Sequence, residues 1–463
     1  MREVSAAGVR WGVAPHGTDR ATRSLAPDGT WRWALGLILV VAFAVRLYLV
    51  TGPSSWQPYT IDSTTGRYIM RGMRLSGAPG PMYDRVARNF LAGRGLVNEP
   101  GSVTPTRAPL YPLILAGMYS LVDEPLLPIG ILHALLGTVT CLLVWQAARM
   151  MSSNAVGLLA AGITAVMPEF LKYTPRLYAS TLLVFLTAAF VVAVFAARRR
   201  KSAWWSVLPG LLLGLVALTR LELLVLLPAV LIWQLLDGGT TWRQRLARCT
   251  LMTAGLALVV SPWLIYNRTT SVDELADAGG GSLGNWLWGH NNPYAQTVWE
   301  DPPTGPGALE RGLGAVPVHA ARDRIQAELG SSDPKAVEGY FKQRAIEFIL
   351  AHPIRVAELV VSRLMLLWNL WPTPPPPLPA FLAYWAFLGV ALVGIVLTWR
   401  QPETRLLVFM LIAVTLFYSF IHGHPRYRLP ATVTVIMLFA VGATQVWNRL
   451  RRGTGGMNPA RRA

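Results

Sequence analysis

The sequence predicts an all-α membrane protein that crosses the bilayer many times. Of its 463 residues, 53% are hydrophobic and 14% are charged, whereas soluble globular chains carry about 25% charged residues. Several uncharged runs, such as 178–197, reach the length of about 20 residues that a helix needs to cross the hydrocarbon core. These observations favour a bundle of about ten transmembrane helices, within a range of nine to twelve.

Ten apolar runs are candidate spans: 33–51, 126–147, 155–172, 178–197, 204–219, 222–237, 251–267, 378–398, 404–421 and 429–447. Arginine-rich segments separate several of them, at 198–201, 243–248 and 449–452. Positive charge is retained on the cytoplasmic side of membrane proteins. When these segments are placed inside, all ten spans alternate and both termini are cytoplasmic.

This count divides the chain into three parts. We expect 1–31 to be a disordered cytoplasmic tail, 32–448 the transmembrane domain and 449–463 a basic cytoplasmic tail. Two large loops, 52–125 and 268–377, then face outward, and the apolar run 108–122 becomes a re-entrant or surface-lying helix. Another amphipathic helix is predicted within 335–371, lying on the membrane surface.

Composition also bears on partners and cofactors. The net charge of +18 is explained by the basic clusters at span ends, and no basic, aromatic-rich soluble domain is present to bind nucleic acid. Cys141 and Cys249 are too few for a disulfide framework or a zinc site. His422 and His424 have no acid or cysteine beside them and make a weak ligand set. We expect no required cofactor; a divalent metal is compatible with the sequence but unsupported by it.

The first outer loop crowds polar residues into an otherwise apolar chain. Apolar residues at helical spacing across 83–91 predict an amphipathic helix with Asp84 and Arg88 on its flanks. Gly93 and Gly95 are expected to end this helix. The plain alternative is a surface helix whose charges are simply solvated.

Five segments in order resemble the GT-C glycosyltransferases, in the branch of the protein O-mannosyltransferases and the lipid A aminoarabinose transferase (glycosyltransferase family 39-like). They are 83–95, 107–112, 210–220, 261–263 with 288–293, and 425–430. The resemblance implies a GT-C-like bundle in the bacterial cytoplasmic membrane. It also implies transfer of a sugar, with inversion, from a polyprenyl-phosphate-linked donor to a hydroxyl of a lipid, glycan or protein on the outer face.

Such a transfer needs a carboxylate to take the proton of the acceptor hydroxyl. In relatives a catalytic aspartate stands about four residues before the tyrosine that matches Tyr83, but here that position is Pro79. Asp84 is the nearest acid on the same predicted helix, and Asp62 lies earlier in the loop. Other acids remain open: Glu99 and Glu222. A catalytically altered member of the family is also open.

The leaving lipid phosphate needs cations nearby. Arg107 matches a family cation that contacts the donor phosphate, and Arg426 and Arg428 in the last outer turn are candidates for a second contact. Each of them has an ordinary alternative, which is to reach the phosphates of membrane lipids. Candidates for the sugar or acceptor pocket are Tyr83, Arg88, Tyr111, His290, Asn291 and Asn292. Ser180 and Tyr266 stand where relatives often carry a glutamate and an arginine, which implies a divergent pocket.

Three other functions remain open. A transporter or flippase of lipid-linked sugars should show ionisable residues deep inside spans and internal repeats, and neither is visible. An O-antigen ligase or polymerase would share the lipid-phosphate chemistry but not the five ordered segments. The proline at position 79 leaves room for a non-catalytic membrane scaffold.

Overall fold

The structure is a computed structural model of the chain. It describes residues 29–52, 60–61, 68–69, 79–98, 108–122, 126–270, 283–293, 295, 297, 334–370 and 377–455. Most of both predicted tails, and the candidate residues Asp62, Glu99 and Arg107, lie outside the described residues.

Ten apolar helices of the described chain correspond to the ten predicted spans, which confirms the fold class. Seven are long and apolar enough to cross a membrane: α1 (Thr30–Thr51), α4 (Leu126–Met151), α7 (Ser180–Arg198), α10 (Trp242–Thr270), α16 (Leu378–Thr398), α17 (Pro402–Ile421) and α18 (Leu429–Gly455). Three are shorter: α5 (Asn154–Val166), α8 (Val207–Thr219) and α9 (Leu226–Leu236). The chain is therefore a multi-pass membrane protein.

Each shorter helix is flanked by a second helical piece. These pieces are α6 (Pro168–Tyr173), η1 (Ala203–Ser206) and η2 (Leu221–Val225). The predicted span 155–172 divides at Met167, because Pro168 cannot donate a backbone hydrogen bond and instead begins α6.

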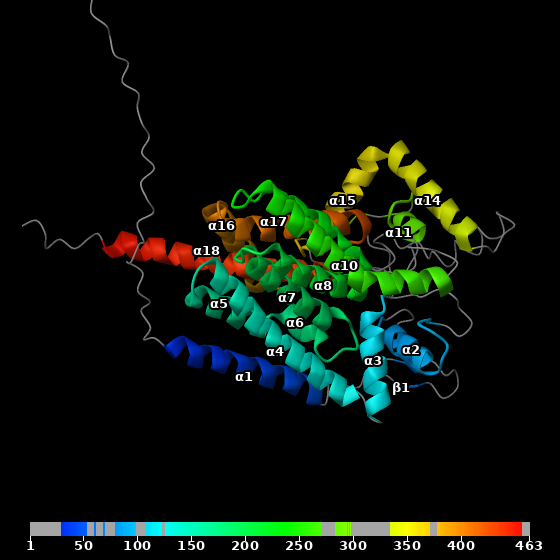
Figure 1. Cartoon of the computed structure of the whole chain (residues 1–463), viewed down its shortest axis with the longest axis horizontal. Coiled ribbons are helices and arrows are strands. Elements are labelled where there is room, and N and C mark those ends of the chain that lie inside the picture. Colours follow the sequence, from blue (N-terminus) through cyan, green and yellow to red (C-terminus); the bar gives the residue numbers. More distant parts are fainter. Residues whose placement is uncertain are drawn as a thin grey trace, which may run out of the picture.

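Both ends of the helical chain lie at one end of the bundle (Figure 1). Helix α1 begins there and α18 ends there, which agrees with an even number of crossings. The elements of the two large loops gather at the opposite end. They are α2 (Pro79–Leu91), α3 (Leu110–Leu121), α11 (Leu283–His290), α14 (Pro334–Ala351), α15 (Pro353–Leu367) and the strand pair β1 (Thr60–Ile61) and β2 (Tyr68–Ile69).

The apolar run 108–122 forms helix α3. It has 12 residues and rises only about 18 Å, which is short of the hydrocarbon core of about 30 Å. Helices α5, α8 and α9 are about as short, but each is extended by a flanking helical piece and α3 is not, so the non-spanning helix stays a prediction. The prediction of a single helix within 335–371 is wrong. The helix breaks at His352, before Pro353, and the segment forms two helices, α14 and α15.

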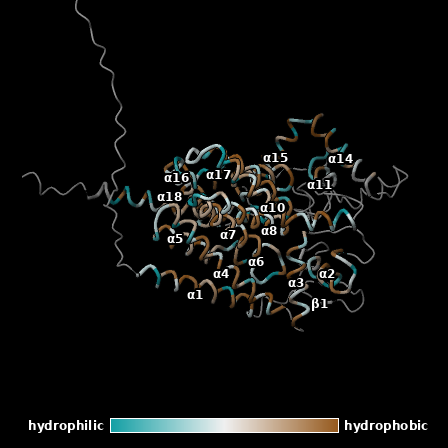
Figure 2. The backbone as a smooth tube through the Cα atoms, in the orientation of Figure 1, coloured by the Kyte–Doolittle hydropathy of each residue, from teal (hydrophilic) through white to brown (hydrophobic). Residues whose placement is uncertain are grey.

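Close backbone packing holds two pairs of spans together. A Cβ added at Gly210 of α8 would stand 2.1 Å from the Met252 carbonyl oxygen of α10, and one at Gly394 of α16 would stand 2.1 Å from the Leu438 carbonyl oxygen of α18. Small residues at such crossings let helix backbones meet in a bilayer, where apolar burial alone gives little driving force. Figure 2 shows hydrophobic residues along the bundle and hydrophilic ones at the far end of α18.

Candidate active site

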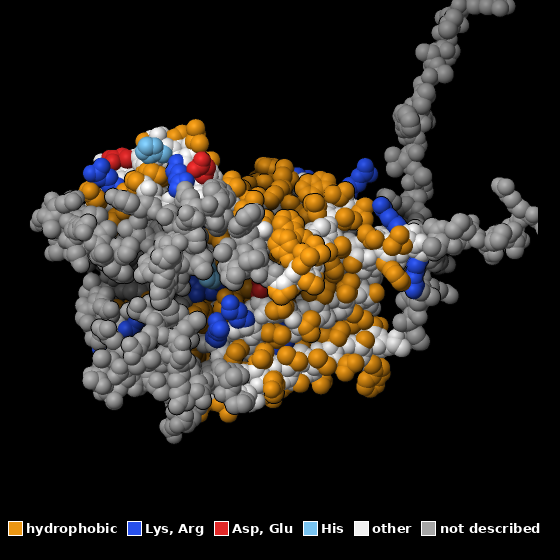
Figure 3. Space-filling model, turned by 180° about the vertical axis from the view of Figure 1, so that it is seen from behind, with side chains coloured by type: hydrophobic (Ala, Val, Ile, Leu, Met, Phe, Trp, Pro, Cys, Tyr) orange, Lys and Arg blue, Asp and Glu red, His pale blue; other side chains and the backbone are white. Residues whose placement is uncertain are grey.

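Four cations gather where three short turns meet at the α2–α3 end of the bundle. Lys172 ends α6, Arg176 lies in the turn before α7, Arg220 lies between α8 and η2, and Arg426 lies in η4 (Pro425–Arg428) between α17 and α18. We call these four residues the cation cluster. Figure 3 shows basic side chains gathered where the orange apolar surface ends.

One tyrosine ring brings two of the cations together. The Arg220 guanidinium carbon lies 4.2 Å from the centroid of the Tyr427 ring, and that of Arg426 lies 5.2 Å from the same centroid. Arg426 also lies 5.4 Å from the Tyr178 ring. The electron-rich faces of these rings attract the guanidinium groups, but two like charges in one place still repel each other.

No carboxylate of the described residues lies within ion-pair distance of the cation cluster. The ion pairs of the described residues join other arginines to acids, and none includes Lys172, Arg176, Arg220 or Arg426. Arg220 Nη1 and Arg426 Nε are buried and have no hydrogen-bond partner. Buried donors without acceptors are costly, so this arrangement is suited to an anionic ligand.

Glu222 lies two residues after Arg220. Its charge acts on both Arg220 and Tyr418, and its Oε2 is buried without a hydrogen-bond partner. A carboxylate oxygen that is free to accept, beside cations suited to a phosphate, is the arrangement that a proton-accepting group needs.

Histidine rings border the cation cluster. The His422 ring centroid lies 4.8 Å from that of His290, 6.2 Å from that of His424 and 4.6 Å from that of Tyr427. Burial, reinforced by His290, His424 and two arginines, lowers the pKa of His422 well below its usual value. Burial and the same arginines with Lys172 lower the pKa of His424 to about 4. Both imidazoles are therefore neutral at pH 7.

No metal centre is found among the described residues, where no group of three or more His, Cys, Asp and Glu side chains could hold an ion.

The predicted base Asp84 has other partners. It is 3% exposed, accepts a hydrogen bond of 2.6 Å from the Tyr119 hydroxyl, and accepts from Arg88 Nε at 3.1 Å on both oxygens. Arg88 also lies 4.9 Å from the centroid of the Tyr119 ring. These contacts join α2 to α3, so the structure gives Asp84 and Arg88 a clear structural role.

Tyr83 and Tyr111 connect α2 to a turn of the cation cluster. The Tyr83 ring meets the Tyr111 ring edge-on at 5.0 Å, and both are buried. His133 Nδ1 lies 3.0 Å from the Thr174 carbonyl oxygen, and its Nε2 lies 3.2 Å from the Tyr111 hydroxyl. Since a carbonyl only accepts, Nδ1 donates to Thr174 and Nε2 accepts from Tyr111. This chain of contacts links α2, through α3 and α4, to the turn that carries Arg176.

The end of α2 is fixed by glycine and by α10. Gly93 and Gly95 have φ of 73° and 81° and end α2 as predicted. The Leu96 amide donates to the Tyr266 hydroxyl at 3.3 Å, so Tyr266 joins the first outer loop to α10.

Arg428 does not belong to the cation cluster, because other residues occupy its guanidinium group. It is 3% exposed, forms an ion pair with Glu169 and donates to the Leu367 carbonyl oxygen at 2.8 Å. Glu169 also accepts from Thr432 at 3.3 Å. Arg428 therefore ties α6 to α15 and α18, and no nitrogen of this residue is left without a partner.

The segment 290–292 is tied to Arg363. Arg363 Nη1 donates to Asn291 Oδ1 at 3.2 Å and to the Phe420 carbonyl oxygen at 2.7 Å, and Nη2 donates to the His290 carbonyl oxygen. The Asn292 amide donates to the Trp288 carbonyl oxygen at 2.7 Å. Asn291 and Asn292 are fully buried, so they cap α11, and the His290 ring is the part of this segment that faces His422.

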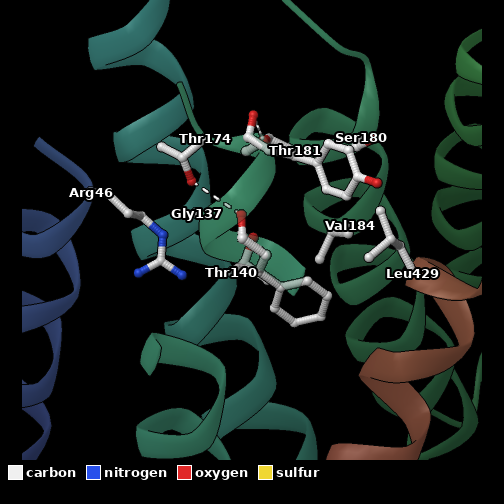
Figure 4. Close-up of a pocket in the computed structure, with 10 residues that line it drawn as sticks. Arg46, Gly137, Thr140, Thr174, Ser180, Thr181, Val184 and Leu429 are labelled. Carbon is white, nitrogen blue, oxygen red and sulfur yellow. Dashed lines mark hydrogen bonds between the residues drawn. The ribbon is translucent and has the colours of Figure 1, made fainter. Parts of the chain in front are cut away.

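A pocket with several hydroxyl groups adjoins the cation cluster through Tyr173 (Figure 4). Its lining comes from α1, α4, α6, α7, the turn between α6 and α7, and α18: Arg46, Gly137, Thr140, Phe170, Tyr173, Thr174, Ser180, Thr181, Val184 and Leu429. Ser180 thus lies in the wall of this pocket.

The ten-span count places the turns that follow the predicted spans 155–172 and 204–219 on the outer side, but Lys172, Arg176 and Arg220 were not predicted as site residues. One signal could have found them. They are basic residues in short turns on the side that the retention of positive charge disfavours, so each calls for a local explanation.

Known proteins share this architecture. Residues 106–266 match the family model described as dolichyl-phosphate-mannose-protein mannosyltransferase. The apo structure of ArnT from Cupriavidus metallidurans aligns with 92% of this chain and 62% of its own at a TM-score of 0.53 and 13% identity. The chain has the GT-C fold.

Two liganded structures with the GT-C fold also align. One is ArnT from Cupriavidus metallidurans bound to undecaprenyl phosphate, with 14% identity, a TM-score of 0.50, and 93% of this chain and 63% of that chain covered. The other is the oligosaccharyltransferase AglB from Archaeoglobus fulgidus, in complex with an inhibitory peptide and a dolichol-phosphate. It has 15% identity and a TM-score of 0.51, with 93% of this chain and 52% of that chain covered.

This chain therefore spans about half to three fifths of the length of these GT-C proteins. No curated protein matches it in sequence.

Proposed function

We propose that this protein is a membrane glycosyltransferase that moves a sugar from a polyprenyl-phosphate-linked donor to an acceptor hydroxyl. The observation that carries the proposal is the cation cluster. Two of its guanidinium groups share one tyrosine ring, and two of its buried nitrogens have no acceptor. A lipid phosphate would supply both the charge and the acceptors.

The likenesses support a lipid-linked donor. The ArnT structure contains undecaprenyl phosphate and the AglB structure contains a dolichol-phosphate. Both ligands join a phosphate to a long isoprenoid chain, which must lie at the membrane. The cation cluster lies where the turns between apolar helices meet, so a phosphate could reach it while its lipid tail stays among the helices.

The proposed reaction balances without a cofactor. The acceptor oxygen bonds to the anomeric carbon, the bond from that carbon to the phosphate oxygen breaks, and polyprenyl phosphate leaves with the electron pair. Arg220 and Arg426 stabilise the charge that develops on the phosphate. The acceptor proton passes to a carboxylate, for which Glu222 is placed best among the described acids. Attack from the face opposite the phosphate inverts the anomeric centre.

We further propose that residues 32–448 form one catalytic domain in a bacterial cytoplasmic membrane. The basic segments 198–201 and 243–248 would lie inside with both termini, and the cation cluster outside. The acceptor would be a lipid, a glycan or a protein, and the sugar a hexose or a pentose.

The test is a transfer assay with purified protein in lipid nanodiscs. Polyprenyl monophosphates carrying radiolabelled hexoses or pentoses are supplied, and the released polyprenyl phosphate and labelled product are measured. We expect turnover of a lipid-linked donor, to an acceptor or slowly to water. Turnover of a nucleotide sugar without turnover of any lipid-linked donor would contradict the proposal. Movement of intact donor across the bilayer without release would instead identify a flippase.

A further inference from the structure

A second basic cavity lies at the opposite end of the bundle from the cation cluster. It lies between the end of α7, the start of α8, the end of α9 and the start of α10. Helix α7 begins four residues after Arg176 and ends at Arg198, and its 19 residues rise about 28 Å. The two sites are therefore separated by most of the thickness of a membrane.

Three arginines line this cavity, but its carboxylate, Asp237, accepts hydrogen bonds from only one of them. Arg198 donates through Nε at 2.9 Å and through Nη2 at 3.2 Å to the two oxygens of Asp237. Glu403, nearby, lies 3.7 Å from Arg198 and 3.9 Å from Arg199. The negative charges of Asp237 and Glu403 are thus balanced by the positive charges of Arg198 and Arg199 at the end of α7.

The other two arginines hold only backbone carbonyl groups. Arg245 donates to the Leu235 carbonyl oxygen at 2.8 Å and to that of Thr240 at 3.1 Å. Arg248 donates to the Arg200 carbonyl oxygen at 2.7 Å. Carbonyl oxygens satisfy donors but do not neutralise charge, so two positive charges remain in the cavity wall.

Arg248 supplies the observation that points to a ligand. Its side chain lines the cavity, it is 7% exposed, and its Nε is buried without a hydrogen-bond partner. Ser206, Gln234 and Thr240 add polar groups to the same wall. The wall therefore offers two cations, one free donor and several hydroxyl and amide groups, which suits a phosphate diester.

Exposed aromatic residues place the cavity at the level of lipid head groups. Trp204 and Trp205 lie in η1, directly before the cavity-lining Ser206, and Trp242 begins α10; all three are exposed. Arg200 lies 4.7 Å from the centroid of the Trp205 ring. Tryptophan collects at the membrane–water interface, and basic pockets between helices at the cytoplasmic interface bind anionic head groups.

We propose that this cavity binds the phosphate head group of an anionic phospholipid from the leaflet opposite the candidate active site. Arg245 and Arg248 contact the phosphate, and the polar wall contacts the glycerol. The acyl chains extend along the apolar surface of the neighbouring helices.

The test uses full-length protein and phosphatidylglycerol. Native mass spectrometry measures how much phosphatidylglycerol stays bound after release from mixed phosphatidylglycerol and phosphatidylcholine vesicles, and a thermal melt measures protection by each lipid. We expect wild-type protein to retain phosphatidylglycerol selectively and to melt several degrees higher with it. Arg248→Gln should lower that retention about tenfold, while Arg243→Gln, an exposed neighbour outside the cavity, should not.

Several results would overturn the proposal. Equal retention of the two lipids by wild-type protein would do so even if the Arg248 variant fails to fold. An equal loss in the Arg243 and Arg248 variants would show general surface attraction instead of a site. Protection by millimolar inorganic phosphate as strong as that by the lipid would show a site for soluble anions.

Discussion

The Arg220 guanidinium carbon lies 4.2 Å from the centroid of the Tyr427 ring, so a cation from the α8–η2 turn rests on a residue from the α17–α18 turn. Segments about two hundred residues apart in the sequence thus meet at one point. Arg426 approaches the same ring at 5.2 Å. This contact is the centre of the proposed phosphate site.

The first prediction concerns the charge of Arg220. Arg220→Gln should lower turnover of a lipid-linked donor by about 10²–10³-fold, the usual loss when one group that stabilises developing charge is removed. Steady-state rates on purified variants measure the effect. Arg344→Gln is the control, since Arg344 is exposed on α14 and contacts Glu347 and the Tyr340 ring of the same helix. Equal rates in the two variants would exclude Arg220 from the site.

The second prediction separates two candidate bases. Glu222→Gln should lower turnover about a hundredfold or more and leave the melting temperature almost unchanged. Asp84→Asn should instead lower the melting temperature, because Asp84 accepts hydrogen bonds from Tyr119 and Arg88. A hundredfold loss in a stable Asp84 variant, with wild-type rates in the Glu222 variant, would restore Asp84 as the base.

The third prediction follows from the lowered pKa of His422. The folded protein holds His422 neutral, while an unfolded histidine takes up a proton below about pH 6.5. The unfolded state then binds more protons, so stability falls as the pH drops from about 6.5 toward the lowered folded-state pKa, by at most about 1.4 kcal/mol per pH unit for this group.

Melting temperatures between pH 7.5 and 5 measure this slope. His422→Gln should make this slope shallower but not remove it, because His424, whose pKa is lowered to about 4, still contributes. His352→Gln, at an exposed histidine before α15, should keep the wild-type slope. A His422 variant with the wild-type slope would show that another group causes the acid sensitivity.

The fourth prediction concerns the ion pair of Glu169 and Arg428. Glu169→Gln should destabilise the protein by about 3–5 kcal/mol, because it leaves the buried charge of Arg428 without compensation. Glu347→Gln removes an exposed pair with Arg344 and should cost at most about 1 kcal/mol. Reversible unfolding in mixed detergent measures both, and similar small costs would mean that water reaches Arg428.

The fifth prediction tests the close approach of α8 and α10. Gly210→Ala places a Cβ 2.1 Å from the Met252 carbonyl oxygen, so the helices must separate and the melting temperature should fall sharply. Gly162→Ala in α5 meets nothing within 4 Å and should be neutral or slightly stabilising. Similar melting temperatures for both variants would show that the crossing is loose.

Much of the fold could be read from the sequence. Apolar runs predicted all ten helices and the short α3, because hydrophobic length is a property of local sequence. The break at His352 was missed, since periodicity continues across Pro353 and only the proline signals it.

The candidate site was less predictable. Arg426 was named because its turn carries a family motif. Arg220 also ends a motif segment, 210–220, but its place beside Arg426, like that of Arg176, depends on three turns meeting in space. Arg428 carried the same motif signal as Arg426, yet it is buried against Glu169, 259 positions away in the chain. Local sequence cannot show which of two neighbouring arginines finds a distant carboxylate.

The most direct test is the position of the donor phosphate. A cryo-electron microscopy map of the protein with bound undecaprenyl phosphate should show the phosphate between Arg220 and Arg426, within hydrogen-bond distance of both guanidinium groups. A phosphate bound elsewhere, with these two arginines in the same positions as without ligand, would contradict the account.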